Sequence, residues 1–345
     1  MQPIITIGIP IYNVEQYVEK ALLSALNQSF ALPYEILVVD DRGTDNSMSI
    51  VNDLKQSHPR GNCIRIVEHR ENSGPGCAKT TIIENALGTY LSILDSDDWI
   101  DEKMLDVLYT KAIETDAELV VADVVHVYDD TYWQRTHYKE NYINHKGAGA
   151  YAISHKIENI HQEWWGKLWS VDFLRKTHIY NDFRIMDDVL PHFRMCAEVQ
   201  KVAWVSYVVY YYRIRSNSLM TSVFYEKVRQ TITAYVETIE EAKTLLQGKY
   251  CNIDGIYDMF VDRVRDAVSN IASLPIDDSE KQTFGAQIYD FSQYIPSIKV
   301  LHNKHNRLAY LICRNRDTYS QAKLAFLIAP KKLWGRLSRN LLGLL

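Results

Sequence analysis

Leu91-Ser-Ile-Leu-Asp-Ser-Asp-Asp-Trp-Ile100 joins a run of strand-forming residues to three closely spaced carboxylates. Asp95, Asp97 and Asp98 repel one another, so a fold that keeps them needs a compensating partner. A divalent cation is one such partner, because Mg²⁺ and Mn²⁺ prefer hard oxygen ligands. The alternative is a solvated acidic turn that caps a helix beginning near Asp101. The stretch by itself favours neither explanation.

Strands and helices alternate on both sides of this stretch. Apolar and β-branched runs predict strands at residues 4–11, 35–39, 63–68, 90–94 and 118–125. Apolar residues at helical spacing predict helices at 14–28, 77–87 and 102–115, and a further helix ending near residue 56. Asn13 is a suitable N-cap for the first helix. Such alternation is typical of a parallel, doubly wound α/β sheet.

Polar residues follow three of the expected strands. The first strand ends at Pro10–Asn13, the second at Asp40-Asp41, and the fourth at Asp95–Asp98. In open α/β sheets ligands bind outside the carboxyl ends of the strands, and these three ends meet at one edge of the sheet. The convergence favours a functional acidic stretch over a capping turn.

The pattern changes after residue 125. Residues 126–160 are expected to form an insertion and connector, followed by a helix at about 187–199 and two strands at 202–206 and 208–213. Helical patterns then occupy about 225–247, 252–274 and 279–293, with a basic helical tail at 317–345. The change of pattern near residue 222 predicts a domain boundary there.

Composition restricts the class of protein. A chain of 345 residues with 47% hydrophobic residues is large enough for one or two well-packed cores. No apolar run reaches the about 18 residues of a membrane span, and the first residues lack the basic region of a signal peptide. Five widely separated cysteines fit reduced thiols in a cytosol better than disulfides or a zinc site.

The charge is unevenly distributed. Residues 299–345 contain ten Lys and Arg and one acidic residue, Asp317, although the whole chain has a net charge of −5. The tail combines these basic residues with Trp334 and several leucines, a composition typical of contact with an anionic membrane surface. The alternative is a tail helix docked on the acidic body. The acidic body and the lack of a known module argue against nucleic-acid binding.

Eight short motifs occur in order over about residues 3–221. They are Ile9-Pro-Ile-Tyr-Asn13, Val38-Val-Asp-Asp-Arg-Gly-Thr-Asp45, Asn72-Ser-Gly74, Ala86-Leu-Gly-Thr-Tyr90, Leu94-Asp-Ser-Asp-Asp-Trp99, Lys167-Leu-Trp169, Met186-Asp-Asp-Val-Leu190, and Tyr212-Arg213 with Ser218. In order and spacing these motifs resemble glycosyltransferase family 2, the inverting GT-A enzymes that use nucleotide-diphosphate sugars. The resemblance is strongest to bacterial members that build capsule, exopolysaccharide or lipopolysaccharide O-antigen repeats.

The resemblance implies a GT-A domain, Rossmann-like with a mostly parallel sheet, at residues 1–222. Its nucleotide-sugar half is 1–125 and its acceptor half 126–222; a helical domain at 223–316 and a basic amphipathic tail at 317–345 follow. The implied activity is inverting transfer from a UDP-sugar to a saccharide, lipid-linked at the inner face of the cytoplasmic membrane. A catalytically inactive scaffold is the alternative. A sugar-nucleotide pyrophosphorylase is disfavoured, because no Gly-rich triphosphate loop follows the first strand.

The resemblance also assigns donor contacts. Tyr12 is expected against the base, and Asp41 is expected to accept a hydrogen bond from the uracil imide N–H. Asp97, with Asp95, is expected to bind Mg²⁺ or Mn²⁺ bridging the two phosphates. Asp98 either supports these ligands or caps the following helix, and the cap is favoured. The full set of expected nucleotide-sugar contacts is Pro10, Tyr12, Asp41, Lys79, Asp95 and Ser96.

Asp187 and Asp188 stand where the family has a Glu-Asp pair. The match gives Asp188 as the general base that takes the proton of the acceptor hydroxyl. Because Asp187 replaces the usual Glu, the choice between the two stays open. Acceptor contacts are expected from Trp164, Trp165, Arg213 and Ser218. For the tryptophans the alternative is core beneath the site, with Trp169 the most structural; for Arg213 and Ser218 it is a surface turn.

Overall fold

The computed structural model describes residues 2–128, 131–149, 152, 160–179, 187–214, 237 and 241. All but the last two belong to Met1–Ser218, the first of two units into which the chain divides. The expected helical domain, the basic tail and Ser218 lie outside the described residues. The predictions made for them, and the predicted domain boundary, therefore stay predictions.

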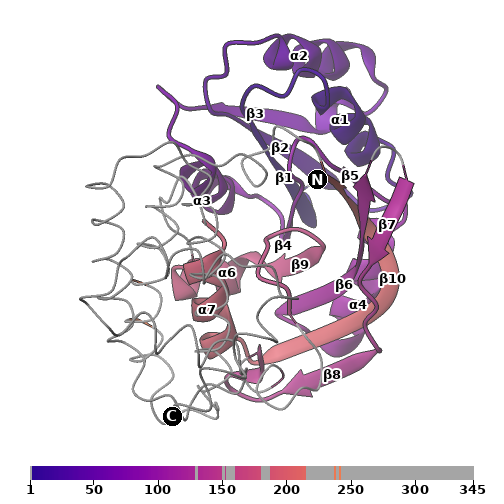
Figure 1. The fold of residues 1–345 in the computed structure, drawn as a ribbon, viewed down its shortest axis with the longest axis vertical. Coiled ribbons are helices and arrows are strands. Elements are labelled where there is room, and N and C mark those ends of the chain that lie inside the picture. The colour runs from indigo at the N-terminus through magenta and orange to yellow at the C-terminus, as the bar shows by residue number, and fades with distance from the viewer. Residues whose placement is uncertain are drawn as a thin grey trace, which may run out of the picture. The chain divides into compact units, whose positions relative to one another are not determined.

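Four parallel strands form the N-terminal half of the sheet (Figure 1). They are β1 (Ile5–Ile11), β2 (Tyr34–Asp40), β3 (Ile64–Glu68) and β4 (Tyr90–Ile93). β1 lies between β2 and β4, and β3 lies outside β2. The chain thus builds outward from β1 on one side and then returns to its other side. The carboxyl ends of β1 and β4 flank this reversal, the place where open α/β sheets bind ligands.

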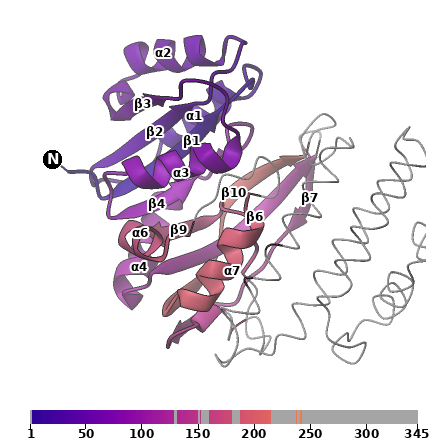
Figure 2. The ribbon, with the colours of Figure 1, turned by 90° about the vertical axis from the view of Figure 1, so that its left-hand side faces the viewer.

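Helices cover both faces of this half. They are α1 (Val18–Leu26), α2 (Ser47–Ser57), α3 (Pro75–Asn85) and α4 (Met104–Thr115), with the short 3₁₀ helix η1 (Gly61–Cys63) before β3. Figure 2 shows α3 on the face turned to the viewer, together with α6 (Val171–Thr177) and α7 (Val189–Glu198). A Cβ at Gly8 would lie 2.3 Å from Ile82 Cγ2, so α3 packs directly against β1.

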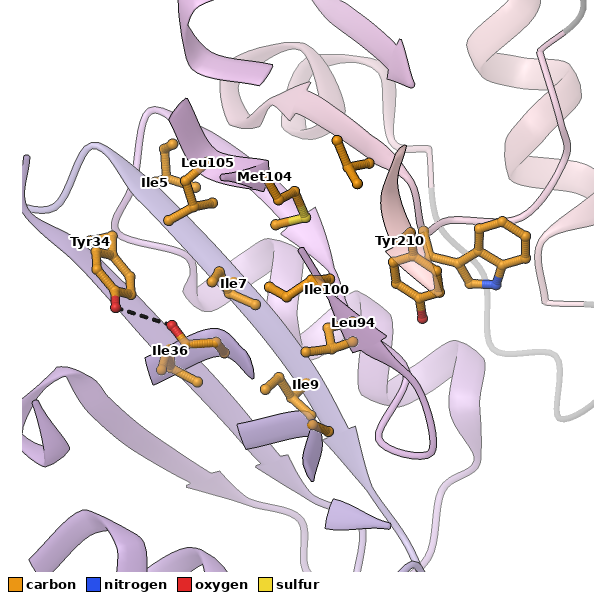
Figure 3. Close-up of a cluster of buried hydrophobic side chains, with 14 of the residues drawn as sticks. Ile5, Ile7, Ile9, Tyr34, Ile36, Leu94, Ile100, Met104, Leu105 and Tyr210 are labelled. Atoms are coloured by element: carbon orange, nitrogen blue, oxygen red, sulfur yellow. Dashed lines mark hydrogen bonds between the residues drawn. The ribbon is translucent and has the colours of Figure 1, made fainter. Parts of the chain in front are cut away.

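The main hydrophobic core lies on the opposite face, against α1 and α4 (Figure 3). Alternate residues of β1, namely Ile5, Ile7 and Ile9, are fully buried there. Because the intervening face of β1 meets α3, the strand is buried on both sides, which explains its continuous apolar run. Tyr34 and Tyr210 stand at opposite ends of this core in Figure 3.

The C-terminal half of the sheet mixes directions. Its strands are β5 (Trp99–Ile100), β6 (Leu119–Tyr128), β7 (Thr131–Arg135), β8 (Asn141–Asn144), β9 (Lys167–Ser170) and β10 (Lys201–Ile214). β6 and β10 are parallel. β9 runs antiparallel between β4 and β6, and β5 and β8 run antiparallel to β10. No helix in these described residues is long and apolar enough to cross a membrane.

Two predictions for this half are wrong. The expected connector at 126–160 contains the end of β6 and the strands β7 and β8, whose polar faces hide the alternation that predicts a strand. The two strands expected at 202–206 and 208–213 are one strand, β10. Its register against β6 shifts between Val205 and Val208 and again between Val208 and Tyr210, so a bulge rather than a turn interrupts the pattern.

The position of Asn13 predicted an N-cap for α1, but Asn13 does not cap this helix. The helix begins after Tyr17, and Asn13 adopts a left-handed conformation with φ of 50°. Its side-chain Oδ1 instead accepts a hydrogen bond of 2.7 Å from the backbone N–H of Thr44. Asn13 therefore ties the loop after β1 to the loop after β2.

Candidate active site

The loops after β1 and β2 meet at the carboxyl edge of the sheet. Besides the contact of Asn13 with Thr44, Asp45 Oδ2 accepts a hydrogen bond of 2.8 Å from the backbone N–H of Glu15. These hydrogen bonds hold together the two loops beside Tyr12. Tyr12 directly follows β1, and its side chain is 47% exposed. An exposed ring on a fixed loop can stack on a planar ligand such as a nucleobase.

Asp41 lies beside this loop but is only 2% exposed. One carboxylate oxygen accepts hydrogen bonds from His69 Nδ1 at 2.7 Å and from the backbone N–H of Ser73 at 2.8 Å. The other accepts from Asn72 Nδ2 at 3.2 Å and from the backbone N–H of Gly74 at 2.9 Å. Four donors fill the acceptor positions of a carboxylate. The expected free acceptor for uracil is thus engaged in holding the loop before α3.

The three crowded carboxylates of the acidic stretch have separate environments. Asp95 and Asp97 follow β4 and are partly exposed, next to the buried Ser96. Asp98 is buried: its Oδ2 accepts from Tyr210 Oη at 2.7 Å and its Oδ1 from the backbone N–H of Arg213 at 2.7 Å. The prediction that Asp98 caps the next helix is wrong, because both oxygens face β10 and α4 begins only at Met104.

Tyr210 and Arg213 of β10 hold this turn. Tyr210 Oη also accepts a hydrogen bond of 3.1 Å from the backbone N–H of Asp95, and Arg213 Nε donates to the carbonyl oxygen of Asp97 at 2.8 Å. The guanidinium of Arg213 lies over the rings of Trp99 and Tyr17, 4.8 and 5.2 Å from their centres. The role of Tyr210 is not visible in the sequence, because its partners lie more than 100 residues away. The acceptor role expected for Arg213 stays a prediction.

Lys79 connects the acidic stretch to Asp187. Its Nζ lies 2.9 Å from Asp187 Oδ2 and 3.7 Å from Asp95 Oδ1. Burial alone would lower the pKa of Lys79, but the carboxylates of Asp187 and Asp95 raise it above its ordinary value. The side chain therefore stays an ammonium and brings together two segments separated by more than 90 residues of sequence. It faces the expected metal ligands from the first turns of α3.

Asp188 directly precedes α7, at the N-cap position, but its side chain makes no capping hydrogen bond. Burial and the negative charges of Asp187 and Glu163 raise the pKa of Asp188 to about 7. Asp187 is paired with Lys79 instead. A carboxyl group whose pKa lies near neutrality suits a general base, because it is ionised at the working pH and still binds a proton effectively. The two neighbouring carboxylates thus have different environments.

The tryptophans form core rather than a surface platform. Trp164, Trp165 and Trp169 are 3–5% exposed, which favours the alternative of core beneath the site, and the acceptor role of the first two rings stays a prediction. Trp165 stacks on Tyr210 with ring centres 5.0 Å apart, and Trp164 Nε1 donates to the carbonyl of Asp187 at 3.4 Å. They support the site from beneath.

A fully buried lysine fixes the loop that carries these rings. Lys167 Nζ donates to the carbonyl oxygens of His161, at 2.6 Å, and of Glu163. Burial lowers the pKa of Lys167 to about 7. The buried amino group and the backbone carbonyls satisfy one another, which is needed because neither has access to water. The Lys167-Leu-Trp169 motif therefore orders the loop before β9, a role that its sequence alone does not reveal.

The donor set fits a divalent cation shared with a diphosphate. Among the residues that the structure describes, no group of three or more His, Cys, Asp or Glu side chains could hold a metal ion. Mg²⁺ usually takes only one or two protein carboxylates and completes its shell with phosphate oxygens and water. Asp95 and Asp97 are two such carboxylates on one partly exposed turn, whereas the carboxylate of Asp98 is turned toward β10.

The chain is similar in sequence to known glycosyltransferases. The family model described as Glycosyl transferase family 2 matches residues 6–171. Glycosyltransferase GlyA of Streptococcus pneumoniae is 28% identical over 257 residues, 70% of this chain but 34% of GlyA. Glycosyltransferase GlyG of the same organism is 27% identical over 235 residues, 65% of this chain and 75% of GlyG. The chain thus spans only a third of one relative.

The fold is similar to that of a solved structure. The crystal structure of S. aureus TarS residues 1–349, in complex with UDP-GlcNAc, superposes with a TM-score of 0.74 at 20% identity. The match covers 94% of this chain and 90% of the TarS chain. This likeness confirms the GT-A fold class expected from the sequence.

Replacing Lys79 by Met should destabilise the fold at neutral pH. The change leaves Asp187 and Asp95 without their cation, and removing one partner of a buried ion pair is strongly destabilising. We expect a loss of about 2–3 kcal/mol, below the range for fully buried pairs because Asp95 is 28% exposed. Urea unfolding of both proteins measures the difference.

The loss should shrink as the pH falls toward 4. Burial raises the pKa of Asp95 and the charge of Lys79 lowers it, so without the ammonium this pKa rises further, the carboxyl takes up a proton, and its unpaired charge disappears. Lys79→Arg is the matched control, since it keeps the charge and should lose less stability. Equal stability of Lys79→Met and wild type at pH 7 would contradict the ion pair.

Proposed function

We propose, from the membership of residues 6–171 in glycosyl transferase family 2, that the protein transfers a sugar from a UDP-sugar to a saccharide acceptor with inversion. The observation that carries the proposal is the contact of Lys79 with both Asp95 and Asp187. It joins the acidic turn at the end of β4 to the carboxylates that precede α7. The contact supports one site that would hold both the diphosphate and a base for the acceptor.

The reaction needs a base on the face of the sugar opposite the departing diphosphate. We assign this role to Asp188, which takes the proton of the acceptor hydroxyl as the oxygen attacks C1 and the bond from C1 to the diphosphate breaks. Its raised pKa and its lack of a capping hydrogen bond support this choice. Asp187, paired with Lys79, keeps that lysine in place.

The donor would lie along the carboxyl ends of β1, β2 and β4. Tyr12 would stack on the uracil ring, while Asp41 would shape the base pocket through the loop that ends at Gly74. Pro10 and Ser96 border the same edge and complete the proposed nucleotide-sugar contacts. The TarS structure with UDP-GlcNAc supports a UDP-sugar, because it shares this fold.

A divalent cation is part of the proposal. Asp95 and Asp97 would hold Mg²⁺ or Mn²⁺ together with the diphosphate oxygens. The cation would stabilise the negative charge of the departing UDP as a Lewis acid. Lys79 lies on the same side and adds positive charge next to Asp95.

Asp188→Asn should abolish most of the transfer while donor binding persists. An amide cannot accept the proton, so kcat should fall about 10²–10⁴-fold, the usual contribution of a general base. Release of UDP from a UDP-sugar in the presence of an acceptor measures the rate, and calorimetry with UDP and Mn²⁺ measures binding.

Asp187→Asn is the matched control for this test. It removes the neighbouring charge but leaves the proposed base, so its kcat should fall less than that of Asp188→Asn. A larger loss in Asp187→Asn would assign the base to Asp187. UDP binding without turnover in wild type would favour the scaffold over an enzyme.

The rate of sugar transfer should also fall on acidification, at a pH that is unusually high for the titration of a carboxyl group. Burial and the charge of Asp187 raise the pKa of Asp188 to about 7, so the base becomes protonated as the pH drops through that value. The acidic limb of kcat/KM should lie well above the ordinary range near 4. In Asp187→Asn the raising charge is gone, so the limb should move to lower pH. An acidic limb near 4 in wild type would contradict the assignment.

The acceptor is proposed to be lipid-linked, in the synthesis of a bacterial capsule, exopolysaccharide or O-antigen. The support is the sequence of the tail, whose basic residues flank Trp334. Each basic residue near an anionic surface contributes about 1 kcal/mol to binding. The tail would thereby keep the protein at the inner face of the cytoplasmic membrane.

Sedimentation with anionic liposomes tests the tail. Full-length protein should pellet with the vesicles, and less of it should do so at high salt because the attraction is electrostatic. A chain truncated after Asn315 should stay in the supernatant. Equal pelleting of both proteins would remove the proposed membrane contact.

A further inference from the structure

The hydroxyl of Tyr210 occupies an unusual position behind the acidic turn. The turn is closed by a hydrogen bond of 3.0 Å from the backbone N–H of Asp98 to the carbonyl oxygen of Asp95. Tyr210 Oη bridges the two ends of this turn, accepting from the backbone N–H of Asp95 and donating to the carboxylate of Asp98. One oxygen atom thus fixes the first and the last residue of the turn.

The pairing and the bulges of β10 place the side chain of Tyr210 next to the acidic turn. Tyr210 pairs with Ile100 in the antiparallel ladder between β10 and β5, so its backbone runs beside the residues that follow the turn. Two register shifts precede it in β10, one of them between Val208 and Tyr210 itself. Bulges reorient the side chains next to them. The ring is fully buried and stacked on Trp165, which leaves the hydroxyl little freedom to move.

The hydroxyl of Tyr210 determines which way the carboxylate of Asp98 points. Without the hydroxyl, the carboxylate of Asp98 would keep one hydrogen bond to β10, from the backbone N–H of Arg213. A buried charged group that loses a hydrogen bond is costly, so the side chain would turn toward the exposed side of the turn. There it would stand beside Asp95 and Asp97 as a third carboxylate. The spacing of oxygen ligands offered to a cation and a diphosphate would change.

We propose that Tyr210 is a positioning residue for the donor site: its hydroxyl keeps Asp98 apart from Asp95 and Asp97 and fixes the turn in the form that binds a nucleoside diphosphate with a divalent cation. The inference rests on the proposed function for its ligand. The arrangement of the turn itself is independent of that function. The two parts can therefore be tested separately.

Tyr210→Phe removes one oxygen atom and keeps the buried ring. Tyr34→Phe is a matched control, because Tyr34 belongs to the same hydrophobic core, at its other end (Figure 3). Its hydroxyl is also buried and donates to backbone carbonyls of α1, at 3.0 Å for Ala25 and 3.2 Å for Leu26. Both variants lose a comparable hydroxyl, but only one loses a contact with the acidic turn.

Hydrogen exchange of the segment 91–100 and calorimetry with UDP and Mn²⁺ are the two measurements. Tyr210→Phe should exchange faster in this segment and bind UDP about tenfold more weakly, the effect of one lost hydrogen bond to a charged group. Tyr34→Phe should match wild type in both measurements, although its melting temperature falls as well. A change in melting temperature shared by both variants reports only the core.

A double-mutant cycle with Asp98→Ala tests whether Tyr210 acts through Asp98. If it does, Tyr210→Phe should add little to the loss of UDP affinity already caused by Asp98→Ala. If the losses of UDP affinity in the two single variants add up in the double variant, Tyr210 does not act through Asp98. Wild-type exchange and affinity in Tyr210→Phe would overturn the whole inference. Faster exchange in Tyr210→Phe, together with a wild type that binds no UDP, would support the hold on the turn and overturn the donor site.

Discussion

Repulsion among carboxylates is the constraint on which the rest of this domain depends. Five aspartates, at 95, 97, 98, 187 and 188, converge at one edge of the sheet, and the fold gives each a different environment. Asp98 is buried against hydrogen-bond donors of β10, and Asp187 is paired with Lys79. Burial and the charge of Asp187 raise the pKa of Asp188. Asp95 and Asp97 are the pair whose charge suits a cation and a diphosphate.

The mixed half of the sheet supplies the groups that make this separation possible. β10 carries Tyr210 and Arg213 to the acidic turn, β9 begins with the lysine that orders the tryptophan loop, and α7 starts at the proposed base. The parallel half contributes the strand ends at which the donor is proposed to bind. The proposed ligand edge and its supporting framework thus come from different parts of the chain.

Local patterns in the sequence predicted the parallel half well and the contacts between segments poorly. The apolar run of β1 and the acidic residues after β4 follow from short-range rules, and the structure brings them to the carboxyl edge of the sheet as these rules predict. Asn13 has the chemistry of a helix cap, yet it binds a loop 31 residues away. Asp98 likewise looks like a cap, but its partners are 112 and 115 residues distant. A short polar side chain satisfies either role, and only the tertiary fold decides between them.

Lys79 links the acidic turn electrostatically to the aspartates before α7, one of which is the proposed base. An ammonium is a compact charge that can serve two carboxylates at once, whereas the planar fork of arginine favours a bidentate contact with one. Lys79 uses this property, since its Nζ is within 3.7 Å of Asp95 and 2.9 Å of Asp187. Any change of charge beside Asp95 therefore alters the field at Asp187 and, through it, at Asp188. Substitutions at these positions should not be treated as independent, because they share one cation.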